Sequence, residues 1–282
     1  MNILTFDIEE WFHILDNEST KTAKEWQCYE PRIHDNMERI FGILDETGVK
    51  ATFFCLGWIA EKYPDVIKTI ADKGYEIGTH THMHQLIYEQ HPNVFANDME
   101  RSIKTLEDIS GKKVRCFRAP GFSLCRDNLW VFDILVNLGI TIDSSVFAAP
   151  RMHGGFSDYS CNAPAFIQYN GIRLKEFPVN RAKLAGKSFV YSGGGYFRLF
   201  PYFCIKSWAR KSPYIMAYMH PRDFDAKQPV FKDLPLSRKF KSYIGLSGAH
   251  KKLKKFLNDF EFTDIDGADK IIDWENARVI TV

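Results

Sequence analysis

The chain has 282 residues, of which 45% are hydrophobic and 26% charged, so it can bury a large core as one α/β barrel or as two ordinary domains. Its 37 basic and 35 acidic residues give a formal net charge of +2, which excludes an overall field that would attract nucleic acid or an anionic membrane. Function therefore has to be inferred from local sites.

The first 150 residues alternate between short apolar runs and segments of helical period. Apolar runs predict strands at 2–8, 50–57, 75–80, 114–120 and 140–147. Apolar residues at helical spacing predict helices, each ending at a glycine, at about 33–48, 64–74, 95–111 and 127–139. The repeated strand–helix order predicts a parallel sheet.

The second half is less regular. It has strand-like runs at 172–180 and 214–220 and a glycine-rich turn at 192–198. No linker rich in proline, glycine or serine is visible, so we predict a single catalytic domain over residues 1–282. Basic residues dominate a helical segment at about 234–260, which is either a solvated face or a contact for a phosphate-bearing or anionic partner.

Polar residues that can carry out chemistry follow the ends of the predicted strands. In a parallel α/β protein these ends lie at one edge of the sheet, where functional groups gather. The residues found there are Asp7, Glu9, Glu10, His80, His82, His84, Arg118, Asp143 and His220. Their agreement with the strand ends is the strongest functional signal in the sequence.

The histidines of the stretch THTHMH permit two kinds of metal site. On a strand all three histidines would share one face, whereas on a helical turn only His80 and His84 align, four residues apart. The glycine and threonine before His80 favour a strand that ends there and a turn that follows. We therefore predict that His80 and His84 bind a metal ion together and that His82 points away.

Two histidines need an anionic third ligand to form an open, catalytic metal site. On an extended strand Asp7 and Glu9 point to the same side, and Glu10 points to the other. Glu9 is the predicted ligand, with Glu10 as the alternative, and Asp7 stays free to act as a base.

Four stretches resemble, in order, the motifs of the polysaccharide deacetylases, the NodB-homology domain of carbohydrate esterase family 4. They are TFDIEE, GTHTHMH, FRAPGFS and YMHP. The stretches DSSVF, EFPVN, GGGYFRLFPY and MHPRDFD are similar to a bacterial subgroup associated with exopolysaccharide and surface-glycan gene clusters. One departure is that the family's first motif has adjacent aspartates, whereas Ile8 follows Asp7 here, so the ligand role does not map uniquely.

The resemblance implies a fold and a reaction. The fold would be a single distorted (β/α) barrel, with seven strands as one expected form, and an open doubly wound sheet is the alternative. The reaction would be metal-dependent removal of N-acetyl groups from amino sugars of a bacterial surface polysaccharide or its precursor. The cofactor would be one divalent ion, zinc in the first instance, with nickel, cobalt or iron as alternatives.

The resemblance also implies roles for individual residues. Asp7 would be the base, Arg118 would orient it, and His220 would protonate the leaving amine. Asp143 would either hold His220 in its acid form or cap the next helix.

Two further sets of candidates concern the substrate. A backbone N–H at Gly121 or Phe122 would stabilise the oxyanion of the intermediate. Trp11, Phe122 and Tyr196 flank the motifs and are candidates for stacking on sugar rings, although aromatic residues at this density more often belong to a core.

Two other classes remain open. A metal-free amide or cyclic-imide hydrolase on the same fold would need no ion and a small cyclic substrate. A non-catalytic carbohydrate-binding protein would need neither base nor acid, so the presence of Asp7, Arg118 and His220 together with two aligned histidines argues against it.

Location is predicted from the first residues and the cysteines. The first twenty residues lack a basic stretch followed by an apolar one, and no apolar run approaches the about 18 residues of a membrane span. The six cysteines form no C-x-x-C pair and suit buried free thiols. These features predict a cytoplasmic protein without a transmembrane segment.

Overall fold

The computed structural model describes residues 1–282 except 16, 149–153, 157–158, 160 and 185–186. Its main sheet contains β1 (Asn2–Ile8), β2 (Thr52–Cys55), β3 (Glu76–Thr79), β4 (Cys116–Phe117), β5 (Ile142–Asp143), β6 (Ala165–Tyr169), β7 (Ile172–Glu176), β10 (Ile215–Met219) and β11 (Val279–Thr281). A separate hairpin pairs β8 (Ala182–Leu184) with β9 (Lys187–Phe189).

The strands of the main sheet lie in the order β10-β1-β2-β3-β4-β5-β7-β6-β11. From β10 to β7 each strand runs parallel to its neighbour, and β6 is antiparallel to β7. This confirms the predicted α/β class with a mostly parallel sheet. No pairing among the described residues joins β10 to β11, so closure of the sheet is not observed there.

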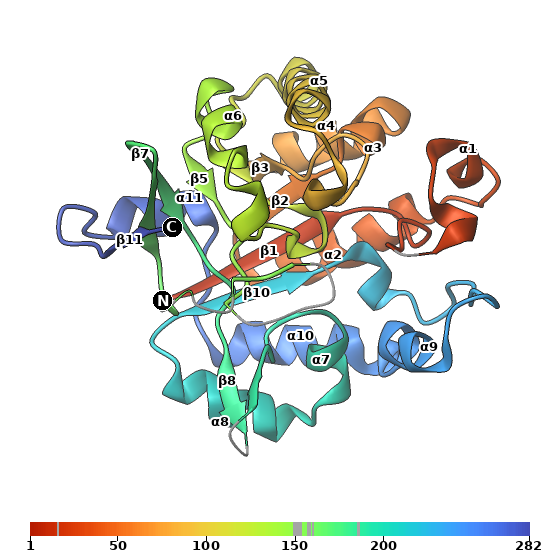
Figure 1. Cartoon of the computed structure of the whole chain (residues 1–282). Coiled ribbons are helices and arrows are strands. Elements are labelled where there is room, and N and C mark those ends of the chain that lie inside the picture. Colours follow the sequence, from red (N-terminus) through yellow and green to blue (C-terminus); the bar gives the residue numbers. More distant parts are fainter. Residues whose placement is uncertain (16, 149–153, 157–158, 160, 185–186) are drawn as a thin grey trace.

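Helices surround the sheet. They are α1 (Ala23–Trp26), α2 (Ile33–Thr47), α3 (Gly57–Lys62), α4 (Pro64–Asp72), α5 (Pro92–Ser110), α6 (Val131–Asn137), α7 (Gly194–Leu199), α8 (Tyr202–Lys211), α9 (Leu236–Tyr243), α10 (Leu246–Asp259) and α11 (Ile265–Ile271). In Figure 1, α4, α5 and α6 lie above β1 and β10, and α7, α8 and α10 lie below. Among the described residues, no helix combines the length and apolar character that crossing a membrane requires.

The local signals in the sequence explain most of the first half. Helix α2 ends where Gly48 adopts a φ of 66°, and α5 begins at Pro92 and ends at Gly111, which also has a φ of 66°. β2 is buried along its whole length, as expected for a central parallel strand. The predicted elements of this half are therefore confirmed, with shifts of a few residues at their ends.

The second half departs more from the prediction. The glycine-rich stretch expected as a turn begins helix α7. Gly193 is needed there because a Cβ at this position would lie 2.2 Å from the Tyr218 ring of β10. The short helix α3 was also not predicted, because it is too short to show a helical period. The main sheet passes through both halves of the chain, since β5 pairs with β7, and the single-domain organisation stays a prediction.

The basic segment forms α9 and α10, and part of it has structural contacts. Lys252 Nζ donates hydrogen bonds to the carbonyl oxygens of Phe197, Arg198 and Phe200. Lys254 pairs with Glu46. These two lysines therefore tie α10 to its neighbours, and contact with an anionic partner stays a prediction.

Candidate active site

Glu9, His80 and His84 come together at the carboxyl edge of the sheet. Glu9 follows β1, His80 follows β3, and His84 lies one turn further along the chain. One ligand atom from each lies within 4.8 Å of the other two, and all three side chains are buried. His82 points elsewhere, as expected, with Nε2 3.6 Å from Glu61 Oε2.

The protonation states of this cluster suit metal binding. His80 Nδ1 donates to the Arg118 carbonyl oxygen at 2.7 Å, which leaves Nε2 with its lone pair. Burial lowers the pKa of His80 to about 4, so the ring is neutral at pH 7. Burial alone would raise the pKa of Glu9, but the interaction with the neighbouring His84 ring, together with the charge of His220, lowers it to about 2.

The cluster fits a divalent ion. Two imidazoles and one carboxylate are the ligand set of an open, catalytic zinc site. Glu9 Oε2 is buried and makes no hydrogen bond of normal geometry to a described residue, although His84 Nε2 lies 2.9 Å away. A bound cation would satisfy this buried oxygen better than a contact of poor hydrogen-bond geometry does.

Asp7 lies two residues before Glu9 and is held by a buried arginine. Its Oδ1 accepts a hydrogen bond from Arg118 Nη1 at 2.7 Å, and Arg118 is 0% exposed. The guanidinium also donates to Thr5 Oγ1 and to the carbonyl and hydroxyl oxygens of Ser144. With this many fixed partners, Arg118 can hold the Asp7 carboxylate in one orientation.

His220 follows β10 and faces both carboxylates. Its Nε2 lies 3.5 Å from Glu9 Oε1 and 3.9 Å from Asp7 Oδ2, while Nδ1 is 3.1 Å from Asp223 Oδ2. Asp223 in turn pairs with Arg198 Nε at 2.9 Å. Burial lowers the pKa of His220, but the Asp223 hydrogen bond and the Glu9 charge outweigh it and raise the pKa to about 9. At pH 7 the ring therefore carries a proton on Nε2, next to Asp7.

Comparisons with known proteins agree with this geometry. The polysaccharide deacetylase family model matches residues 4–141, which contain Asp7, the Glu9–His80–His84 cluster and Arg118. A peptidoglycan-N-acetylglucosamine deacetylase of Bacillus cereus is 34% identical over 82 residues, which are 29% of this chain and 30% of that protein. Residues 4–141 belong to the polysaccharide deacetylase family. A chitooligosaccharide deacetylase of Azorhizobium caulinodans is 28% identical over 127 residues, 43% of this chain and 59% of that protein.

The rest of the chain matches a second family model, and two solved structures share the fold. Residues 144–270 match a domain of unknown function (DUF3473). A protein of Mycobacterium smegmatis described as a polysaccharide deacetylase shares the fold with a TM-score of 0.68 at 18% identity, covering 100% of this chain and 92% of that one. A family pseudoenzyme from Bacillus anthracis has a TM-score of 0.50 at 14% identity, covering 100% and 63%. The chain spans 30%, 45% and 29% of the length of the first three curated relatives it matches.

Glu10, the alternative metal ligand, caps a helix instead. Its Oε1 accepts hydrogen bonds from the backbone N–H groups of Arg32 and Ile33, at 2.8 and 2.9 Å, where α2 begins. Its Oε2 accepts from Trp11 N at 3.2 Å. A carboxylate at a helix N-terminus satisfies N–H groups that have no partner within the helix. The structure thus places Glu9, and not Glu10, beside the histidines.

We expect Glu10→Gln to leave metal binding intact and to lower stability. The amide retains one acceptor oxygen but loses the charge at the α2 N-terminus, so the free energy of unfolding should fall by about 1–2 kcal/mol. Urea unfolding and metal analysis of the purified variant measure the two quantities. Loss of the metal from Glu10→Gln with retention in Glu9→Gln would contradict the assignment.

The expectation that Asp143 holds His220 is wrong, because Asp223 occupies that position. Asp143 instead accepts from the Ser145 hydroxyl and pairs with Glu176. Burial raises the pKa of Asp143 to about 6 and that of Glu176 well above its usual range, so the two carboxyls share a proton. Asp223 was not among the predicted functional residues, although its place three residues after the histidine in MHPRDFD was a signal for it.

Of the two backbone N–H groups expected to stabilise the oxyanion, one is already hydrogen-bonded within the protein. The Phe122 N–H donates to the Ala119 carbonyl at 2.9 Å, closing a turn, so it is engaged already. Gly121 occupies a left-handed conformation with a φ of 58° in the same turn. Of the two, the Gly121 N–H stays the candidate donor.

The expected sugar-stacking residues are mostly covered. Trp11 is 3% exposed, and its indole N–H donates to the Glu30 carbonyl at 2.9 Å. Phe122 is 4% exposed and packs against the Tyr218 ring. The prediction that Trp11 and Phe122 stack on sugar rings is therefore wrong, because neither ring presents an open face. Tyr196 is 42% exposed on α7, and its role stays a prediction.

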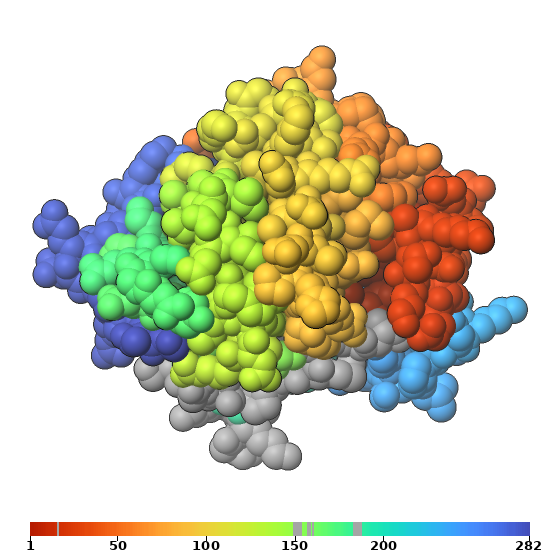
Figure 2. Space-filling view, turned by 45° about the horizontal axis from the view of Figure 1, so that its top comes forward, coloured from red at the N-terminus to blue at the C-terminus, as the bar shows by residue number. Residues whose placement is uncertain are grey.

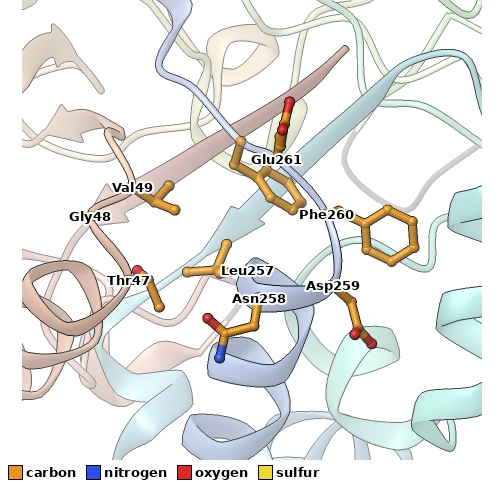
Figure 3. Close-up of a pocket in the computed structure, with 9 residues that line it drawn as sticks. Thr47, Gly48, Val49, Leu257, Asn258, Asp259, Phe260 and Glu261 are labelled. Atoms are coloured by element: carbon orange, nitrogen blue, oxygen red, sulfur yellow. The ribbon is translucent and has the colours of Figure 1, made fainter.

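A cavity of about 390 Å³ borders the Glu9–His80–His84 cluster. Residues of segments 13–26 and 83–89 line it, including His84 itself. Figure 2 shows the N-terminal segment in red beside the orange and gold segments that follow β3. A second pocket of about 440 Å³, lined by Thr47–Val49 and residues 257–262, is drawn in Figure 3. It lies before β2, at the opposite edge of the parallel sheet from Glu9, and so takes no part in the site.

Proposed function

We propose that the chain hydrolyses the N-acetyl group of an amino sugar in a bacterial surface polysaccharide or its precursor, with the help of one divalent metal ion. The observation that carries this proposal is the convergence of three kinds of group at one sheet edge. A metal-ligand set, a carboxylate fixed by a buried arginine and a protonated imidazole lie within a few ångströms of one another. Family membership supports amide hydrolysis on a sugar.

Glu9, His80 and His84 would hold the ion. Bound there, a divalent ion supplies Lewis-acid polarisation of the amide carbonyl and lowers the pKa of water toward about 7. Asp7 Oδ1 is occupied by Arg118, so Oδ2 is the oxygen that takes the proton from the attacking water. The Arg118 contact keeps this carboxylate in one orientation for each cycle.

His220 would complete the reaction as the general acid. The C–N bond of the tetrahedral intermediate breaks only when the amine nitrogen receives a proton. His220 Nε2–H faces Asp7 and Glu9, so it points to the space where the intermediate forms. Asp223 fixes the ring by accepting from Nδ1, and Arg198 holds Asp223 in place. The cavity beside His84 offers room for part of the glycan.

The test is acetate release that depends on metal. Purified protein would be loaded with zinc, cobalt or nickel and given N-acetylglucosamine oligomers, with acetate measured by a coupled assay. We expect release from the loaded wild type and none from Asp7→Asn, which keeps its shape but loses the base. A metal-loaded protein that binds the oligomers without releasing acetate would favour a carbohydrate-binding protein. A metal-free protein that opens cyclic amides would favour the other hydrolase class.

A further inference from the structure

The turn that carries both metal-binding histidines has an unusual backbone. Between His80 and His84, Thr81 has a φ of 68°, and His84 itself has a φ of 54°. Both lie in the left-handed region, which β-branched and bulky residues rarely adopt. A turn of this kind persists only where surrounding contacts hold it.

Helix α5 supplies part of these contacts through one carboxylate. Asp98 Oδ2 accepts a hydrogen bond from His82 N at 2.6 Å, and Asp98 Oδ1 accepts from Met83 N at 3.1 Å. Both donors lie between the two ligands. One turn later on the same face of α5, Ser102 Oγ donates to the Thr81 carbonyl at 3.0 Å.

Helix α3 binds carbonyl groups of the same turn. Gly57 N donates to the Thr81 carbonyl at 2.9 Å, and Trp58 N donates to the His82 carbonyl at 3.1 Å. The carbonyl groups of the turn therefore face donors from α3 and α5, whereas the His82 and Met83 N–H groups depend on Asp98. Removing that carboxylate would leave two N–H groups of the turn without an acceptor.

We propose that Asp98 is a positioning residue that sets the affinity of the Glu9–His80–His84 cluster for a divalent cation, by fixing the turn on which His84 stands. This inference rests on the metal site of the proposed function. Asp98 belongs to neither the ligand set nor the acid–base pair, and it acts through the backbone alone. A carboxylate is required because its two oxygens accept from two N–H groups at once, while an asparagine offers one oxygen and turns an NH₂ group toward the second donor.

The test is a direct titration of the metal-free protein with Zn²⁺ in competition with a chromophoric chelator. We expect Asp98→Asn to weaken zinc binding by about 10–100-fold, the range found when the groups that orient metal ligands are removed. Asp98→Glu retains both oxygens and should recover part of the loss. The matched control is Asp108→Asn on the same helix, where an exposed carboxylate pairs with Lys104, and its zinc affinity should equal that of the wild type.

A second readout separates positioning from general destabilisation. The absorption bands of bound Co²⁺ report the ligand geometry, and we expect them to shift in Asp98→Asn while the far-ultraviolet circular dichroism of the metal-free protein is unchanged. Equal zinc affinity and an unchanged cobalt spectrum in Asp98→Asn would overturn the inference and leave the metal site intact. A wild type that binds neither ion would overturn the proposed metal site and this inference together.

Discussion

His84→Ala is expected to remove the metal ion and the hydrolytic activity together. The substitution leaves Glu9 and His80, and two ligands do not form the three-ligand site that catalytic zinc requires. Loss of the ion removes the polarisation of the amide carbonyl, so kcat/KM should fall by more than about 100-fold. Elemental mass spectrometry of the purified variant measures the ion, and acetate release measures activity.

The neighbouring histidine offers a matched control for this variant. His82 lies in the same turn and is as deeply buried, but its Nε2 lies 3.6 Å from Glu61 Oε2, and His82 does not belong to the ligand cluster. His82→Ala should therefore keep the ion in near-stoichiometric amount, although the cavity it leaves is expected to lower stability. If both alanine variants retain the metal, the Glu9–His80–His84 cluster is not the binding site.

The site was largely predictable because its residues follow a simple rule of parallel sheets. Polar residues end or follow four of the five strands of the first half, β1, β3, β4 and β5, and a parallel sheet carries these strand ends to one edge. The alignment of His80 with His84 followed from the glycine and threonine that end β3. The choice between Glu9 and Glu10 followed from strand alternation, and the structure adds the reason that Glu10 is occupied elsewhere, at the start of α2.

The parts that sequence did not predict depend on contacts between distant segments. Asp143 follows a strand as the other site residues do, but Glu176 from β7 packs against it, and this pairing cannot be inferred from either local sequence. Trp11 flanks the first motif, yet Glu30 and Phe231 cover it from two other segments. Asp223 lies on the short turn after His220 and is predictable from that spacing, whereas Asp143 was the candidate because it ends a predicted strand.

Arg118→Met is expected to cause the largest loss of stability among the site variants. Arg118 is fully buried, and its guanidinium satisfies Asp7, Thr5 and Ser144 while lying 4.2 Å from the centre of the Phe54 ring. Methionine retains most of the volume but donates no hydrogen bond, so the Asp7 carboxylate stays buried without its partner. Breaking a buried ion pair from one side lowers the free energy of unfolding by about 3–5 kcal/mol.

A double-mutant cycle with Asp7→Asn shows whether the unpaired charge is the cause. Asp7→Asn alone should abolish acetate release and cost less stability than Arg118→Met, because the neutral amide tolerates burial better than a carboxylate does. In the double variant no carboxylate is left unpaired, so it should be more stable than the sum of the single losses predicts. Urea unfolding of the four proteins supplies the cycle. Strict additivity would mean that Arg118 stabilises the fold through Thr5, Ser144 and Phe54 and not through the base that it orients.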